Sequence, residues 1–258
     1  MTGVPHDGKG TALVVGGSGG IGQGVCATLA REGWDIAITY RTGESRAQAA
    51  AQAVRALGRR AEIFALDLAQ AESAPGLMAA VVAEFGALDS LIYVAGPLVR
   101  LTHISKTDPA LMEAHLIQDA MGFFRLAHAA LPALRHSQGS IVACHSAAQY
   151  RYAPADGLSV IPKAAVTATM KGIAKEEGRF GVRANGVAIG LIEAGQHQAL
   201  SAVGDITDTY LTAAAKATPL RRPGTPEDIG QAIAFFADKA RSGFVTGQII
   251  SVDGGYSV

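Results

Sequence analysis

Short apolar runs alternate along the chain with longer segments in which apolar residues recur every three or four positions. The short runs are apolar throughout rather than at every second position, which is typical of strands buried on both faces of a parallel sheet. The longer segments have the spacing of helices that bury one face. We therefore expect seven strands, at residues 11–15, 35–39, 61–66, 90–95, 140–145, 182–188 and 248–252.

The order of these segments predicts the fold class. Strands that alternate with helix-length segments and are joined by right-handed crossovers form a doubly wound α/β sheet of the Rossmann type. No linker, repeat or low-complexity tract interrupts the pattern, so residues 1–258 are expected to form a single domain. The long irregular stretch 191–218 is predicted to be a substrate lid. Helices are expected at 44–57, 72–85, 109–134, 164–179 and 226–238.

Charge and composition narrow the class of protein. The chain has 22 basic and 22 acidic residues, and this balance does not suit a nucleic-acid or membrane-surface partner. The first ten residues lack the features of a secretory signal, and no apolar run approaches the ~18 residues of a membrane span. Cys26 and Cys144 lie in apolar settings and are expected to be buried free thiols. We therefore expect a cytoplasmic protein.

Two further features concern assembly and metals. The chain is 49% hydrophobic and only 17% charged, against about 25% charged in an average soluble domain. This composition favours a homo-oligomer, in which an interface hides part of the surface. The histidines, including His103, His115 and His197, have no metal-ligand spacing, so no metal is expected.

The stretch "VGGSGGIGQG" follows the first predicted strand. It fits G-x-G-x-x-G at Gly17, Gly19 and Gly22, and it also fits G-x-x-x-G-x-G at Gly16, Gly20 and Gly22. Either register brings backbone close to a pyrophosphate at a helix N-terminus, where free N–H groups and the helix dipole favour an anion. Because the motif follows a strand and opens a helix, it predicts dinucleotide binding.

The end of the second strand indicates which dinucleotide binds. A cofactor with a free ribose 2′-hydroxyl needs a carboxylate here, but the sequence is "ITYRTGES", with Tyr40 and Arg41. Asp35 lies at the opposite end of the strand, where a structural role is expected. An arginine suits a 2′-phosphate through paired charge-assisted hydrogen bonds. We therefore predict NADP(H).

These motifs, together with "ALDLA", "GSIVACHSAA", "KAAV", "GVRANGVAIG", "PLRRPGTPEDI" and "FVTGQIISVDGG", resemble the short-chain dehydrogenase/reductase family over nearly the whole chain. The resemblance implies a nicotinamide cofactor, a small-molecule substrate and a dimer or tetramer. It also implies a role for Lys163 at the nicotinamide ribose. The other cofactor-binding positions it implies are Gly16, Ser18, Gly20, Ile21 and Gly22 at the pyrophosphate, Asp67 with Leu68 at the adenine, Ala95 and Gly96 along the adenosine, and Gly190 and Ile192 at the nicotinamide.

The catalytic set of that family is Asn, Ser, Tyr and Lys, and the chain matches only half of it. Ser146 aligns with the serine and Lys163 with the lysine, whereas Asp119 stands at the asparagine position and Ser159 at the tyrosine position. A serine hydroxyl is a far weaker acid than a tyrosine, whose pKa is about 10. Ser159 therefore cannot replace tyrosine as the proton donor, although it can still donate a hydrogen bond.

Two neighbouring features bear on the absence of the catalytic tyrosine. Pro162 disfavours helical geometry at Ile161, so the helix is expected to begin at or after Pro162, and the one-turn spacing of Ser159 and Lys163 is then not assured. Tyr150 and Tyr152 follow Ser146 closely. They could fold back over the nicotinamide, or they could pack within the lid.

One branch of the family, the dienoyl-CoA reductases, is similar in lacking the tyrosine, and some members have an aspartate at the asparagine position. In the reduction of a conjugated C=C bond, hydrogen-bond donors can hold the enolate oxygen, and a water polarised by Asp119 could deliver the proton. The lid sequence "AGQHQALSAVGD" has no basic cluster, which counts against an acyl-CoA substrate.

The leading hypothesis is an NADP(H)-dependent oxidoreductase that reduces an activated C=C or carbonyl group. In it Ser146 polarises the substrate oxygen, Lys163 holds the ribose, and Asp119 with Ser159 replaces the usual proton relay. The alternative is a non-redox protein on the same fold, either a partner subunit or a cofactor-sensing scaffold. A third hypothesis is a lyase or isomerase. A serine hydrolase is excluded, because the adjacent His145 and Ser146 point to opposite faces of a strand.

Overall fold

The computed structural model describes residues 8–195, 200–201, 204 and 207–258. Seven strands form one sheet in the order β3-β2-β1-β4-β5-β6-β7, and every neighbouring pair is parallel. This arrangement confirms the doubly wound α/β fold expected from the sequence. The strands are β1 Thr11–Val15, β2 Asp35–Tyr40, β3 Ala61–Ala65, β4 Ser90–Tyr93, β5 Ser140–Ser146, β6 Arg183–Ile189 and β7 Ile249–Val252.

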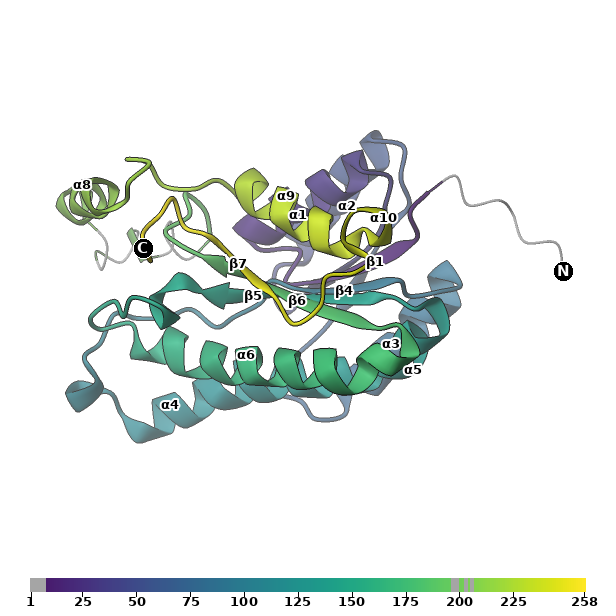
Figure 1. The fold of residues 1–258 in the computed structure, drawn as a ribbon, viewed down its shortest axis with the longest axis horizontal. Helices are drawn as coiled ribbons and strands as arrows, with labels where there is room; N and C mark the ends of the chain where they lie inside the picture. The colour runs from purple at the N-terminus through teal and green to yellow at the C-terminus, as the bar shows by residue number, and fades with distance from the viewer. Residues whose placement is uncertain (1–7, 196–199, 202–203, 205–206) are drawn as a thin grey trace, which may run out of the picture.

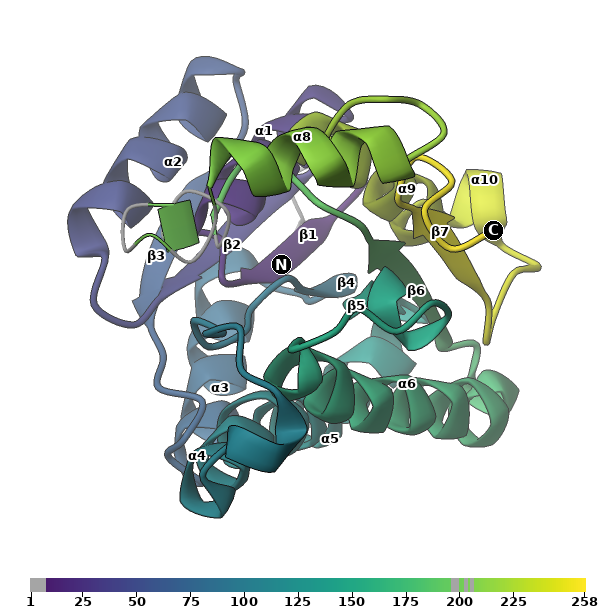
Figure 2. The same cartoon turned by 90° about the vertical axis from the view of Figure 1, so that its left-hand side faces the viewer.

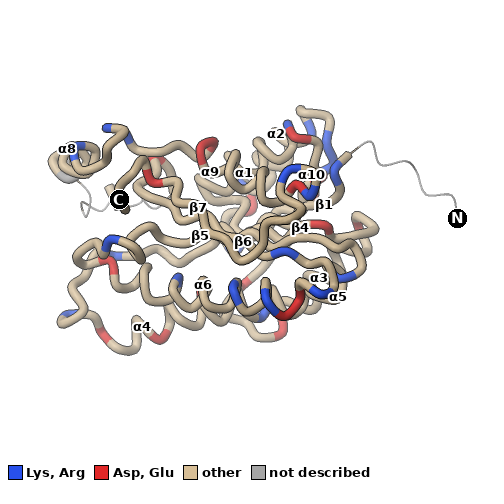
Figure 3. The backbone as a smooth tube through the Cα atoms, viewed as in Figure 1, with Lys and Arg blue, Asp and Glu red and all other residues tan. Residues whose placement is uncertain are grey.

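Helices cover both faces of the sheet. In Figure 1, α1, α2, α9 and α10 lie above the sheet, and α3, α5 and α6 lie below it. Basic and acidic residues are interspersed along these elements (Figure 3). The α-helices are α1 Gly20–Arg31, α2 Glu44–Ala56, α3 Ser73–Phe85, α4 Pro109–His115, α5 Gly122–Ser137, α6 Gly157–Glu177, α8 Asp208–Ala217, α9 Pro226–Ala237 and α10 Lys239–Ser242, with 3₁₀ turns at Ile104–Lys106, Ala147–Gln149 and Gly178–Phe180.

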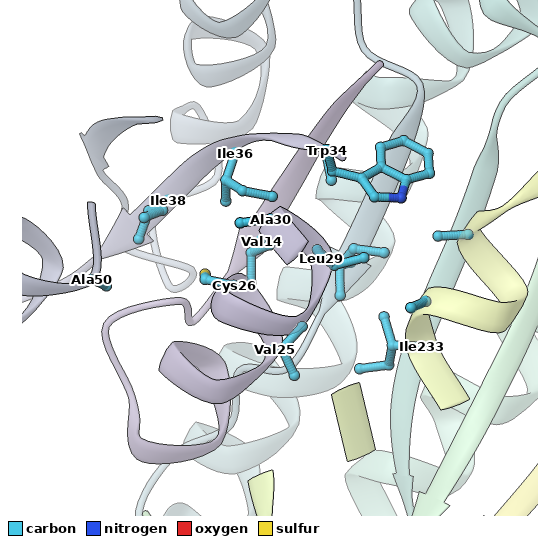
Figure 4. Packing of buried hydrophobic residues seen from close by; sticks show 14 of the residues in the cluster. Val14, Val25, Cys26, Leu29, Ala30, Trp34, Ile36, Ile38, Ala50 and Ile233 are labelled. Atoms are coloured by element: carbon cyan, nitrogen blue, oxygen red, sulfur yellow. The ribbon is translucent and has the colours of Figure 1, made fainter. Parts of the chain in front are cut away.

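Successive side chains of the strands point to opposite faces of the sheet and pack into two hydrophobic cores, one on each face. In β1, Val14 belongs to the core under α1 and α9, whereas Leu13 belongs to the core over α3, α5 and α6. Figure 4 shows the first core, where Val14 lies among Leu29 of α1 and Ile36 of β2. Both cysteines are buried free thiols, as expected, and burial raises the pKa of Cys26 and Cys144 to about 12.

Helix α6 begins at Gly157, so the expectation that it begins at or after Pro162 is wrong. Within a helix Pro162 has no N–H group for the carbonyl of Leu158, four residues earlier. The buried His115 replaces that donor, since its Nδ1 lies 3.2 Å from the Leu158 oxygen and donates to it. A tertiary hydrogen bond thus removes part of the penalty that the local sequence predicts.

Two other segments differ from the expectation. The helix predicted at 109–134 is α4 and α5 with a π-helical turn, Leu116–Met121, between them. The predicted lid 191–218 falls partly outside the described residues, and its described part contains α8 rather than only irregular chain. Figure 2 turns the molecule by 90°, so that the end of the sheet on the left of Figure 1 faces the viewer. Helices α8 and α4 lie on opposite sides of that end.

Candidate active site

A crevice runs along the carboxyl ends of the strands, where parallel α/β sheets bind ligands. It crosses the point between β1 and β4 at which the strand order reverses. The crevice consists of a hollow of about 250 Å³ and a larger one of about 1130 Å³, and both are lined by Gly16, Ser18, Arg46, Ala95 and Gly96. A ligand can therefore extend from one hollow into the other.

The glycine loop forms the shared wall of the two hollows. Gly16 has φ +86°, and a Cβ there would lie 2.9 Å from the Cα of Ala95. A Cβ on Gly22 would overlap the carbonyl oxygen of Gly16. Among the described residues, none accepts a hydrogen bond from the N–H groups of Gly20, Ile21 and Gly22, which open α1. Close backbone and free N–H groups at a helix N-terminus fit a pyrophosphate.

The smaller hollow brings together the residues expected around the adenosine half. Tyr40, Arg41, Asp67 and Leu68 all line it. The sequence reasoning missed Arg46, which lies in the first turn of α2 and lines both hollows. Its position five residues after Arg41, at a predicted helix start, was the available signal. Arg41 and Arg46 thus both line this hollow, and a guanidinium group can bind a phosphate ester through paired hydrogen bonds.

Asp35 takes no part in this hollow. It opens β2 at the opposite end of the strand and forms an ion pair with Arg59, 2.8 Å away. Its carboxylate also accepts a hydrogen bond from the N–H of Arg60. Asp35 therefore has the structural role that the sequence indicated.

Lys163 is fixed by three groups. Its Nζ donates to the carbonyl of Ala95 at 2.8 Å and to the Asp119 carboxylate at 2.9 Å, and it lies 4.9 Å from the ring centre of Tyr93. The Tyr93 hydroxyl donates to the same carboxylate, and burial together with the Asp119 charge raises the pKa of Tyr93 well above its usual value. An ammonium has three N–H groups. One of them is therefore left for a ligand in the larger hollow, which Lys163 lines.

Asp119 lies in the π-helical turn and is only 2% exposed. Among the described residues it is Gln118, not Asp119, that lines the smaller hollow, and Asp119 lines neither hollow. The expectation that Asp119 holds a water beside the substrate stays a prediction. In the structure its carboxylate accepts hydrogen bonds from Lys163 and Tyr93, and it thereby positions the Lys163 ammonium.

Ser146 ends β5 on the wall of the larger hollow. Its Oγ accepts a hydrogen bond from the N–H of Ala148 at 3.2 Å, which leaves its own O–H group to donate to a ligand. The preceding His145 bonds to Thr167 through Nδ1, and burial lowers the pKa of His145 to about 3. His145 therefore does not act as a base for Ser146.

Ser159 and Lys163 lie one turn apart in α6, and both line the larger hollow. Gly190 and Ile192 line it as well, as expected for the nicotinamide half. Tyr150 and Tyr152 are 53% and 48% exposed and line neither hollow.

Among the residues on the wall of the larger hollow that sequence reasoning missed are Asp156, Glu193 and Tyr256, which carry titratable side chains. Asp156 could have been found from its position three residues before Ser159. Tyr256 had no local signal, since only the tertiary fold returns the chain end to the crevice.

Within the described ranges, no three His, Cys, Asp or Glu side chains converge to hold a metal ion. No helix in the described part of the chain is long and apolar enough to span a membrane.

Comparison with known proteins identifies the family. Residues 16–257 match the family model described as enoyl-(acyl carrier protein) reductase. The chain is 31% identical over 247 residues to the 3-oxoacyl-[acyl-carrier-protein] reductase FabG of Staphylococcus aureus, covering 95% of this chain and 97% of that protein. It is also 31% identical over 256 residues to the short-chain reductase protein NovJ of Streptomyces niveus, covering 95% of this chain and 92% of that protein.

A solved structure agrees with these relatives. A short-chain type dehydrogenase/reductase from Mycobacterium ulcerans has a TM-score of 0.89 at 28% identity, covering 97% of this chain and 90% of that chain. The family model that matches residues 16–257, the relatives of similar length and the shared fold support one conclusion: the chain belongs to the short-chain dehydrogenase/reductase family of oxidoreductases.

Proposed function

We propose that the protein is an NADP(H)-dependent oxidoreductase that reduces an activated C=C or carbonyl group of a small molecule. One observation carries the proposal. Ser146 and Lys163 line a hollow that continues, past the glycine loop, into a second hollow lined by two arginines. The first pair suits a substrate oxygen and a ribose, and the arginines suit a phosphate ester.

The chain's own groups would hold the cofactor at several points. The free N–H groups at the start of α1 bind the pyrophosphate, and Arg41 with Arg46 binds the 2′-phosphate. Asp67 and Leu68 flank the adenine. Lys163, kept in place by Asp119, donates to the ribose hydroxyls. When bound, the reduced nicotinamide supplies a hydride.

On the substrate side, the Ser146 hydroxyl donates a hydrogen bond to the oxygen on which charge develops. Ser159 provides a second donor on the same wall. Leu98, Leu101 and Leu200 make part of the wall apolar. The names of the relatives favour activated substrates, because a 3-oxoacyl group holds an activated carbonyl and an enoyl group holds an activated alkene.

The serine at the tyrosine position favours a second candidate, a non-redox protein on this fold that binds the cofactor as a partner subunit or a sensor. Fluorescence titration of the purified protein with NADPH, and separately with NADH, tests cofactor binding. We expect NADPH to bind at least tenfold more tightly, a difference of about 1.4 kcal/mol.

Consumption of NADPH then separates the two candidates. We expect the protein to oxidise NADPH in the presence of acetoacetyl- or crotonyl-N-acetylcysteamine, which are small thioesters with an activated carbonyl and an activated alkene. Binding of NADPH without its consumption would support the non-redox candidate. Failure to bind either cofactor would contradict both. A homo-oligomer and a cytoplasmic location stay predictions, and light scattering of the purified protein tests the first.

A further inference from the structure

Asp156 lines the same hollow as Ser146, Ser159 and Lys163, although nothing in the family motifs marks it. We infer that the Asp156 carboxyl is the proton donor of this active site, in place of the absent tyrosine. The inference rests on the proposed reductase function and assigns the step for which that function lacks a residue.

The side chain of Asp156 does not cap the helix that it precedes. It occupies the N-cap of α6, where an aspartate usually accepts a hydrogen bond from a backbone N–H two or three residues later. Asp108 before α4, Thr225 before α9 and Asp238 before α10 all do so. Asp156 makes no such bond, and no described residue donates to its carboxyl. The half-buried carboxyl is therefore available to a ligand in the hollow.

The residue directly before Asp156 has a strained backbone conformation. Ala155 has φ +68°, a left-handed conformation that is costly for a residue with a Cβ. The carbonyl of Ala155 accepts a hydrogen bond from the N–H of Thr102 at 2.9 Å, and the backbones of Asp156 and Thr102 form an isolated parallel β-bridge. Strain that is held by surrounding contacts is a frequent feature of functional sites. Here the strained residue, Ala155, directly precedes Asp156 at the N-cap of α6.

Asp156, Ser159 and Lys163 follow one another at spacings of three and four residues, so they share one face of α6. The ammonium of Lys163 is already paired with Asp119. The other titratable side chains on this hollow are Arg46, Cys144, His145, Glu193 and Tyr256. Burial raises the pKa of Cys144 to about 12 and lowers that of His145 to about 3, so neither exchanges a proton near neutral pH, and Glu193 is exposed. Within the described residues, Asp156 is thus the carboxyl that stands closest in sequence to the position of the missing acid.

The environment suits an acid that works near neutral pH. Burial raises the pKa of Asp156 to about 7, whereas an ordinary aspartate is ionised at that pH and has no proton to give. An acid is most effective when its pKa lies near the working pH.

The proton step balances with the reductant of the proposed function. The hydride from a reduced nicotinamide brings the electron pair to the substrate carbon. The O–H bond of the Asp156 carboxyl then breaks as a new bond forms to the substrate oxygen, or to the α-carbon of an enolate. Ser159, one turn along the same face, can pass the proton from the Asp156 carboxyl to the substrate. The Asp156 carboxylate takes its next proton from water.

The deciding variant is Asp156→Asn, which keeps the size and the N-cap preference of the residue but removes the acid. Asp108→Asn is the matched control, since it changes a helix N-cap aspartate that lines neither hollow. Tyr256→Phe tests the competing hydroxyl. The measurements are kcat/KM for reduction of acetoacetyl-N-acetylcysteamine as a function of pH, the affinity for NADPH, and the infrared absorption of protonated carboxyl groups.

We expect Asp156→Asn to lower kcat/KM by about 100-fold or more and to abolish the fall in activity above pH 7. Its affinity for NADPH should not change, and Asp108→Asn should resemble the wild type. In the infrared spectrum, a carboxyl band that titrates near neutral pH should be present in the wild type and absent from Asp156→Asn.

Three results would overturn the inference, and each can be told apart from the others. Unchanged kcat/KM in Asp156→Asn, or a loss confined to Tyr256→Phe, would show that another group gives the proton. If the carboxyl band that Asp156→Asn lacks titrated in the ordinary aspartate range in the wild type, Asp156 would be ionised at neutral pH. Absence of NADPH consumption by the wild type would contradict the proposed function itself, and the acid role with it.

Discussion

The Nζ atom of Lys163 lies 2.9 Å from a carboxylate oxygen of Asp119, in an ion pair that joins α6 to the π-helical turn before α5. The two side chains are only 12% and 3% exposed. A buried pair of this kind is stable only while both charges are present, because the removal of one leaves the other without compensation. The position of the Lys163 ammonium in the crevice therefore depends on Asp119.

Lys163→Met and Asp119→Asn should each lower the free energy of unfolding by about 3–5 kcal/mol, measured by urea denaturation. The double variant should lose less than the sum of the two, because it leaves no unpaired charge. Lys171→Met, an exposed lysine of the same helix, is the control and should stay within about 0.5 kcal/mol of the wild type. Strictly additive losses would show that the pair contributes nothing as a pair.

Arg41→Ala and Arg46→Ala should each weaken NADPH binding by about 10- to 100-fold, because a hydrogen bond to a charged group contributes about 1.5–3 kcal/mol. Affinity for NADH should change little, since NADH lacks the 2′-phosphate. Isothermal titration of both cofactors checks this. Arg31→Ala, which removes an exposed arginine paired with Glu227 on another surface, should leave both affinities unchanged. Equal losses for the two cofactors would contradict a 2′-phosphate role.

His115→Phe should destabilise the protein by about 1–3 kcal/mol, because it leaves the buried carbonyl of Leu158 without a donor. Pro162→Ala supplies an N–H group for that carbonyl. In the Pro162→Ala background, the same His115→Phe change should therefore cost less. A double-mutant cycle of urea denaturation curves measures the difference, and a cycle without coupling would show that the two residues act independently.

Stability should depend on pH in opposite directions through His145 and Asp156. The folded-state pKa of His145 is about 3, below the usual 6.5, so its contribution to stability is lost as pH falls through that interval. The folded-state pKa of Asp156 is about 7, above the usual 3.8, so its contribution is lost as pH rises from about 4 to 7.

Consequently, His145→Gln should gain stability relative to the wild type on going from pH 7 to pH 4, and Asp156→Asn on going from pH 4 to pH 8. Each slope has an upper limit of about 1.4 kcal/mol per pH unit. Thermal unfolding across this pH range is the measurement, with His136→Gln and Asp108→Asn as exposed controls. Parallel pH curves for variant and wild type would contradict the environment described for that residue.

The fold, and the residues that line the crevice around the glycine loop, could be predicted from the sequence because those parts depend on local patterns. Apolar runs mark the strands, and the glycines mark the place where backbone must approach a ligand. The wall of the larger hollow around α6 depends on contacts between distant segments. The start of α6 could not be read locally, because Pro162 is compensated by His115 from another helix. Likewise, Asp119 gave no sign that its partner would be Lys163 rather than a water.

The single face of α6 that presents Asp156, Ser159 and Lys163 also sets how this protein can be re-engineered. Because Ser159 and Lys163 belong to one rigid helix and Asp156 is its N-cap residue, their mutual spacing should survive changes made elsewhere in the crevice. Leu98, Leu101 and Leu200 come from other segments of the chain. New substrate preferences should therefore be accessible by altering those leucines, while the reacting groups keep their alignment.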